Sequence, residues 1–166
     1  MPSKQFVKAV LITGFIAGTL DAAAASIQYC INKNDNPAKV FRSVAGAVFK
    51  EKTQTGSVYT WAAWGLLFHF LIAMLFTLFF FLFYRQIRSL LTNKFVAGII
   101  YGIFVWCVMN FLVVPLAFER DLGTHITALF SPEKLKGSLT GLGIIIIAIG
   151  LPISLLADRY YSKKIN

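Results

Sequence analysis

Four long apolar stretches dominate the chain, and shorter polar segments separate them. The stretches cover residues 6–31, 58–84, 95–118 and 139–160. Each is long enough for a helix to cross the hydrocarbon core of a bilayer, which takes about 20 residues. The pattern predicts an all-α fold of the polytopic membrane class, a four-transmembrane-helix bundle in which residues 1–166 form a single integral membrane domain.

The first stretch has two features that argue against a membrane span. Asp21 interrupts it, and Lys4 and Lys8 precede a short apolar run that ends in alanines, as in a secretory signal peptide. Apolar character nevertheless resumes beyond Asp21 and continues through residues 27–31. We therefore predict that this stretch is retained as the first transmembrane helix.

The segment between the first two stretches has a different pattern. Asn36 can cap a helix with Pro37 at its first position, and apolar residues recur at helical spacing through residues 37–50. Lys39 and Arg42 fall on the opposite side. The pattern predicts a short amphipathic interfacial helix whose apolar side dips into the acyl boundary. A connector packed on the end of the bundle fits the same pattern.

The composition agrees with a bilayer environment. Hydrophobic residues make up 57% of the chain and charged residues 14%, whereas roughly 25% of the residues of a soluble domain are charged. The formal net charge of +9 comes from basic residues that flank the apolar stretches and form no dense patch. We interpret them as topology signals and as contacts to anionic lipid headgroups of the bilayer, and we expect no nucleic-acid partner.

The basic residues also predict an orientation. The loop between the second and third stretches holds Arg85, Arg88 and Lys94 and no acidic residue, whereas the next loop mixes basic and acidic residues. Cytoplasmic loops are enriched in lysine and arginine. The short loop is therefore predicted to be cytoplasmic, and both termini with it.

Small residues recur at four-residue spacing in three of the four stretches. In lipid, no hydrophobic force drives helices together, and small residues let helix backbones approach closely. We predict that these contacts form within one chain, while a homo-oligomer or another membrane-protein partner remains an alternative. The candidate helix-packing residues are Gly14, Gly18, Gly98, Gly102, Gly141 and Gly150.

Prolines and aromatic residues mark the ends of the stretches. Pro115 and Pro152 lie near the ends of the third and fourth stretches, where they are expected to end or kink a helix. Tyrosine and tryptophan gather at the headgroup level of membranes. The residues that fit this role are Tyr59, Trp61, Trp64, Tyr160 and Tyr161.

Asp21 is the residue that a bilayer disfavours most, because a carboxylate near the centre of a span costs about 2.5 kcal/mol or more. A rise of about 1.5 Å per helical residue from the nearest basic flank places Asp21, His69 and Asn110 at a similar depth. Gln28 lies further along the first helix on the same side as Asp21 and can extend the group outward. These four residues form the predicted intramembrane polar cluster.

Three interpretations of this cluster stay open. It can be a hydrogen-bonded clasp between helices, which is the one we favour. It can be a titrating or ligand-contacting site, because histidine and a buried aspartate can exchange protons near neutral pH. A metal or haem ligand is least favoured, because His125 lies far from His69 in the sequence and neither Cys30 nor Cys107 has metal-type spacing. We expect no metal and no cofactor.

The chain has no glycine-rich phosphate loop, GxSxG elbow, HExxH or paired-cysteine motif, so we do not expect an enzyme. It resembles a family of small bacterial inner-membrane proteins, the YagU-type proteins. The segments that carry this resemblance are GFIAGTLD at 14–21, GLLFH at 65–69, YG at 101–102, VMN at 108–110 and GLPI at 150–153. The resemblance implies the bacterial inner (cytoplasmic) membrane and no particular activity.

Two classes of function fit these observations best. The first is a non-enzymatic structural or accessory helical bundle, with a partner on its amphipathic segment. The alternative is a small proton-linked transporter or channel that uses the cluster of Asp21, His69 and Asn110. A lipid- or quinone-modifying enzyme would need a lateral pocket that exposes these same groups.

Overall fold

The computed structural model describes residues 3–165 of the chain, and the side chains of residues 3–162. Residues 3–165 form helices and turns and contain no strand. Among them, four helices are long and apolar enough to cross a membrane, and these are Lys4–Lys33, Val58–Leu82, Lys94–Ala117 and Pro132–Ser162. The predicted all-α bundle with four transmembrane helices is confirmed.

The first two spans are single helices, whereas the third and fourth each contain a π-helical turn. The spans are α1 (Lys4–Lys33), α3 (Val58–Leu82), α5 (Lys94–Val108) continuing through the π-helical turn Met109–Val113 into α6 (Val114–Ala117), and α8 (Pro132–Ile145) continuing through the π-helical turn Ile146–Gly150 into α9 (Leu151–Ile165). The connecting elements are α2 (Ala38–Phe49), a 3₁₀ turn (Lys50–Gln54), α4 (Tyr84–Leu90) and α7 (Leu122–Leu129).

The fourth helix begins at Pro132, earlier than the predicted start at residue 139. Ser131 occupies the N-cap position and Pro132 the first helical position, where the missing N–H of proline costs nothing. The first turns of α8 are polar and exposed. They continue the helix beyond its apolar part, which is why hydrophobicity alone placed the boundary too late.

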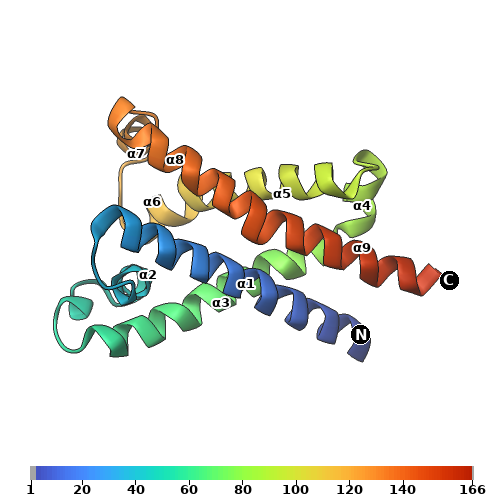
Figure 1. Cartoon of the computed structure of the whole chain (residues 1–166), viewed down its shortest axis with the longest axis horizontal. Helices are drawn as coiled ribbons and strands as arrows, with labels where there is room; N and C mark the ends of the chain where they lie inside the picture. Colours follow the sequence, from blue (N-terminus) through green and yellow to red (C-terminus); the bar gives the residue numbers. More distant parts are fainter. Residues whose placement is uncertain (1–2, 166) are drawn as a thin grey trace.

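The four spans form a fan of crossing helices (Figure 1). α1 lies between α3 and the fourth helix, and α5 packs on the other side of the fourth helix. The Lys4 end of α1, the end of α9 and helix α4 lie at one end of the bundle, and α2 and α7 lie at the opposite end (Figure 1). The chain therefore enters and leaves the bundle on the same side.

Glycines make the closest contacts between the spans. Gly14 and Gly18 on α1 face α3, and a Cβ at Gly18 would lie 2.8 Å from an aromatic ring of α3. Gly98 and Gly102 on α5 face the fourth helix, where Gly150 packs against both of them. These glycine contacts lie within one chain, and each allows two helix backbones to approach more closely than larger residues would.

Two glycines differ from the prediction. A Cβ at Gly141 would meet no atom closer than the Nε1 of Trp106 at 3.8 Å, an ordinary van der Waals distance, and no residue of α8 is buried. The expectation of a close helix contact at Gly141 is therefore wrong. Gly65 was not among the predicted packing residues, yet a Cβ there would overlap the backbone carbonyl oxygen of Phe41. Helix α2 thus crosses α3 at a distance that only glycine permits.

Helix α2 packs its apolar side on α3. Ala45 is fully buried, and the Phe49 ring lies 5.3 Å from that of Trp61 at the start of α3. Val48 is the one large apolar residue of α2 that is exposed. α2 begins at Ala38 with Pro37 at the N-cap position, one residue later than predicted, and the Asn36 side-chain oxygen accepts a hydrogen bond of 2.9 Å from the Ala38 N–H. The apolar side of α2 is thus covered by the bundle, as in a packed connector, and the position of α2 at the membrane interface stays a prediction.

Each π-helical turn ends two residues before a proline. Pro115 follows the turn Met109–Val113, and Pro152 follows the turn Ile146–Gly150. Proline has no N–H to donate, so the preceding helical turn must rearrange, and a wider π turn is one way to do so. Pro152 lies well inside the fourth helix, so it interrupts that helix without ending it.

Candidate functional site

The structure brings Asp21 and His69 together at the contact between α1 and α3. His69 Nε2 lies 2.9 Å from the backbone oxygen of Gly18 and 3.9 Å from a carboxylate oxygen of Asp21. The shorter distance is a hydrogen bond and the longer one is not. Because a carbonyl oxygen only accepts hydrogen bonds, Nε2 carries the proton and donates it. His69 therefore ties α3 to the backbone of α1, beside the Asp21 carboxylate.

Aromatic rings surround this pair. The rings of Phe41 and Phe70 meet the imidazole edge-on, at centroid distances of 6.0 and 5.7 Å. The side chains of His69 and Asp21 are 15% and 18% exposed. The Asp21 carboxylate has no hydrogen-bond donor within the part of the chain that the structure describes. It is thus close to His69 but not fixed by it.

The other two members of the predicted cluster do not join this pair. Asn110 donates its side-chain N–H to the backbone oxygen of Trp106, 2.9 Å away in its own helix. Gln28 makes no side-chain hydrogen bond to Asp21 or His69 among the described residues. The expected layer of four polar residues is therefore reduced to Asp21 and His69, because equal depth does not make helices turn their side chains toward one another.

Three further polar side chains bond from one span to the backbone of another, and none of them was predicted to do so. Tyr101 on α5 donates to a carbonyl oxygen of α3 at 2.5 Å, Ser154 on α9 to one of α5 at 2.8 Å, and Tyr161 on α9 to one of α3 at 2.7 Å. The accepting residues are Phe76, Lys94 and Phe81 respectively. Together with His69, these bonds link all four spans.

A charged cluster around Asp158 closes the end of the bundle at which the chain enters and leaves. Its carboxylate accepts a hydrogen bond of 2.9 Å from the Tyr84 hydroxyl and lies 3.4 Å from Arg88 and 3.6 Å from Lys94. α9 is thereby joined to α4 and to the start of α5. In the sequence, the sign of this cluster was that Asp158 is a single acidic residue at the end of the bundle where the basic second loop also lies.

We predict that Asp158→Asn lowers the free energy of unfolding by about 1–2 kcal/mol, because the amide leaves the partly buried Arg88 without its counter-ion. Lys94 is 45% exposed and adds little. Unfolding in detergent measures the change. Arg159→Gln on the next, exposed position is the control and should unfold like the wild type. Equal stability of the two variants would contradict a structural role for Asp158.

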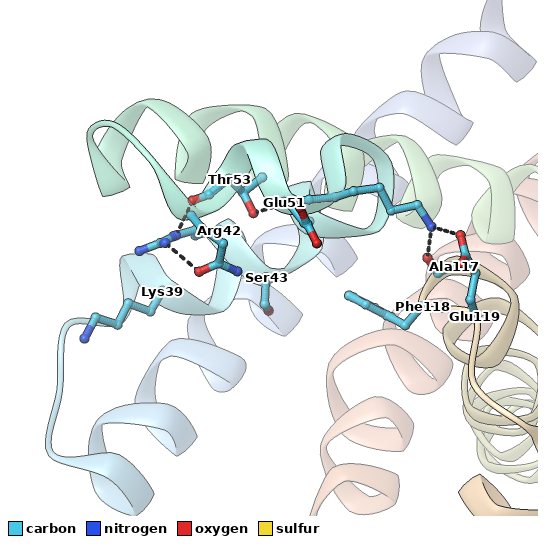
Figure 2. Close-up of a pocket in the computed structure, with 11 residues that line it drawn as sticks. Lys39, Arg42, Ser43, Glu51, Thr53, Ala117, Phe118 and Glu119 are labelled. Atoms are coloured by element: carbon cyan, nitrogen blue, oxygen red, sulfur yellow. Dashed lines mark hydrogen bonds and ion pairs between the residues drawn. The ribbon is translucent and has the colours of Figure 1, made fainter.

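A polar cleft lies at the opposite end of the bundle, and we call it the end cleft (Figure 2). It has a volume of about 580 Å³ and lies between α2, the 3₁₀ turn and the chain that follows α6. Lys50 bridges its two sides, since its Nζ lies 3.1 Å from the Ala117 carbonyl oxygen and 2.7 Å from Glu119. Arg42 holds the 3₁₀ turn through the Thr53 carbonyl oxygen at 2.7 Å.

The charges around the end cleft are present at neutral pH. A hydrogen bond and the positive charge of Lys50 hold the pKa of the Glu119 carboxyl below its ordinary value. A hydrogen bond to Asp35 raises the pKa of the Lys39 amine above its ordinary value. The carboxylates of Asp35 and Glu119 are exposed, so solvent screens both ion pairs. The pairs therefore add little to the stability of the fold.

No group of three histidine, cysteine, aspartate or glutamate side chains among the described residues is placed to hold a metal ion. No protein-family model, curated protein or solved structure matches the chain. The class of protein therefore rests on the fold alone, which is that of a helical bundle with four helices long and apolar enough to cross a membrane.

Proposed function

We propose that the chain is a non-enzymatic structural or accessory bundle of the bacterial inner membrane, of the YagU type. The observation that supports this role is that polar side chains of the spans form hydrogen bonds to the backbone of neighbouring spans. His69, Tyr101, Ser154 and Tyr161 each bond to a backbone carbonyl of a neighbouring span. These polar groups are thus used to hold helices together. An accessory role would be carried out with another membrane protein or a second copy of the chain.

The charge distribution supports an orientation with both termini in the cytoplasm. The loop that contains Arg85, Arg88 and Lys94 lies at the same end of the bundle as the two ends of the chain (Figure 1). Basic loops are retained on the cytoplasmic side of bacterial membranes. In this orientation α2, α7 and the end cleft face the periplasm.

The proposal predicts how two variants respond to pH. His69→Ala should lower the free energy of unfolding by about 0.6 kcal/mol, the average for a hydrogen bond between membrane helices. Asp21→Asn should cause no loss, because the carboxylate makes no hydrogen bond. The unfolding of both variants and of the wild type, followed in nanodiscs from pH 5 to 8, should show little dependence on pH.

The alternative is a small proton-linked transporter, and one observation favours it. The Asp21 carboxylate is 18% exposed and lies 3.9 Å from His69 without a hydrogen bond, so it is free to take up a proton. The stability of the wild type would then change with pH, and Asp21→Asn would abolish that change while the protein stays folded. Proton uptake into proteoliposomes that depends on Asp21 would replace the accessory role with transport.

A further inference from the structure

The end cleft lies at the depth of the lipid headgroups. One side of the cleft is formed by residues 117–119, at the end of the third span. The other side is formed by α2 and the 3₁₀ turn, which come just before the second span begins at Val58. Trp61 near the start of α3 donates its indole N–H to the Thr55 carbonyl oxygen over 2.7 Å, directly after the 3₁₀ turn that lines the cleft. Tryptophan and tyrosine at the start of a span mark the headgroup region. A headgroup beside the bundle would therefore meet this cleft.

The cleft presents both signs of charge, and some of its polar groups are not used by the protein. Lys39 and Arg42 lie one turn apart on α2 at one end of the cleft, with Glu119 at the other and Glu51 and Phe118 between them (Figure 2). The Nη1 of Arg42 and the carboxylate of Glu51 make no hydrogen bond or ion pair among the described residues. Phe118 supplies an apolar surface.

These groups match one kind of headgroup better than others. The Arg42 guanidinium, whose Nε and Nη2 bond to Thr53 and Gln54, keeps Nη1 for a phosphate. The Lys39 amine is paired with Asp35 at 2.5 Å and adds positive charge beside it. The Glu51 carboxylate suits a primary ammonium and would repel a purely anionic headgroup. A quaternary ammonium would fit less well because it has no N–H to donate. We propose that the end cleft binds the zwitterionic headgroup of phosphatidylethanolamine, with its phosphate on Arg42 beside Lys39 and its ammonium on Glu51.

Native mass spectrometry of the full chain in detergent tests this site. The protein would be mixed with equal amounts of phosphatidylethanolamine, phosphatidylglycerol and phosphatidylcholine, and the retained lipids compared. We expect the wild type to retain phosphatidylethanolamine in preference to the other two. Glu51→Gln should lower that preference by about 3- to 5-fold, the scale of one exposed ion pair. Lys39→Gln should lower the retention of all three lipids, since all carry a phosphate.

Charge-matched controls lie on the same end of the bundle, outside the cleft. Glu133→Gln and Lys134→Gln change exposed residues of α8 and should leave the lipid preference unchanged. Equal retention of the three lipids by the wild type, or an unchanged preference in Glu51→Gln, would overturn the proposal. Displacement of the bound lipid by soluble glycerophosphoethanolamine at similar concentration would also overturn it, because the site would then recognise a soluble compound and not a membrane lipid.

Discussion

Gly65→Ala is expected to lower the free energy of unfolding by about 1–3 kcal/mol, or to detach α2 from α3. The reason is that the new methyl group would overlap the Phe41 carbonyl oxygen. The obstacle is backbone on both sides, so no side-chain rotation relieves it. Alanine otherwise favours a helix interior by about 1 kcal/mol over glycine, so a loss of stability has the opposite sign to the intrinsic effect. Thermal unfolding in detergent would measure it.

Gly46 on α2 provides the matched control for this substitution. A Cβ there would lie 3.5 Å from the Thr53 hydroxyl oxygen, an ordinary contact, so Gly46→Ala should be as stable as the wild type or more stable. A Gly65→Ala variant that matched Gly46→Ala would contradict the crossing of α2 over α3 at Gly65.

Gly150→Ala is expected to separate the third and fourth spans, at a cost of about 1–3 kcal/mol. Its Cβ would overlap the Gly98 carbonyl oxygen and lie 2.8 Å from the Gly102 nitrogen. Gly150 ends the π-helical turn that precedes Pro152, where the helix is already interrupted and has few ways to adjust. Unfolding in detergent, together with the oligomeric state by light scattering, would measure the effect.

Gly143 lies two turns earlier in the same helix and serves as the control. No atom lies within 4 Å of a Cβ built there, so Gly143→Ala should keep or raise the stability. If Gly150→Ala instead changed the oligomeric state and left the stability of the protomer unchanged, glycine packing between copies of the chain would replace the packing within one chain.

Both glycine predictions bear on function, because an accessory bundle must keep its shape to present a surface to a partner. The polar bonds from His69 and Tyr101 add little energy each, on the scale of about 0.6 kcal/mol for hydrogen bonds between membrane helices. The glycine contacts determine how closely the helices approach. The polar bonds then fix the register in which they meet.

The candidate site could be predicted only in part from the sequence. Counting residues from the basic flanks placed Asp21 and His69 at the same depth, and the structure puts them 3.9 Å apart. The same count included Asn110, whose amide bonds within its own helix. Depth along a span follows from the rise per residue, whereas the direction in which a side chain points depends on how the helix is rotated against its neighbours.

By itself the sequence determined the elements, which are the four long helices with their approximate bounds, the short helix α2 and the glycine pairs that begin at Gly14 and Gly98. These are local properties, because hydrocarbon forces each span to satisfy its own backbone hydrogen bonds as a helix. Only the tertiary structure decided that α2 crosses Gly65, that Asp158 gathers Arg88 and Lys94, and that hydroxyl and imidazole groups bond to carbonyl oxygens of other spans. Every residue has a backbone carbonyl oxygen, so the residue types do not show which of these oxygens accepts a hydrogen bond from another span. That choice depends on which helix faces pack together.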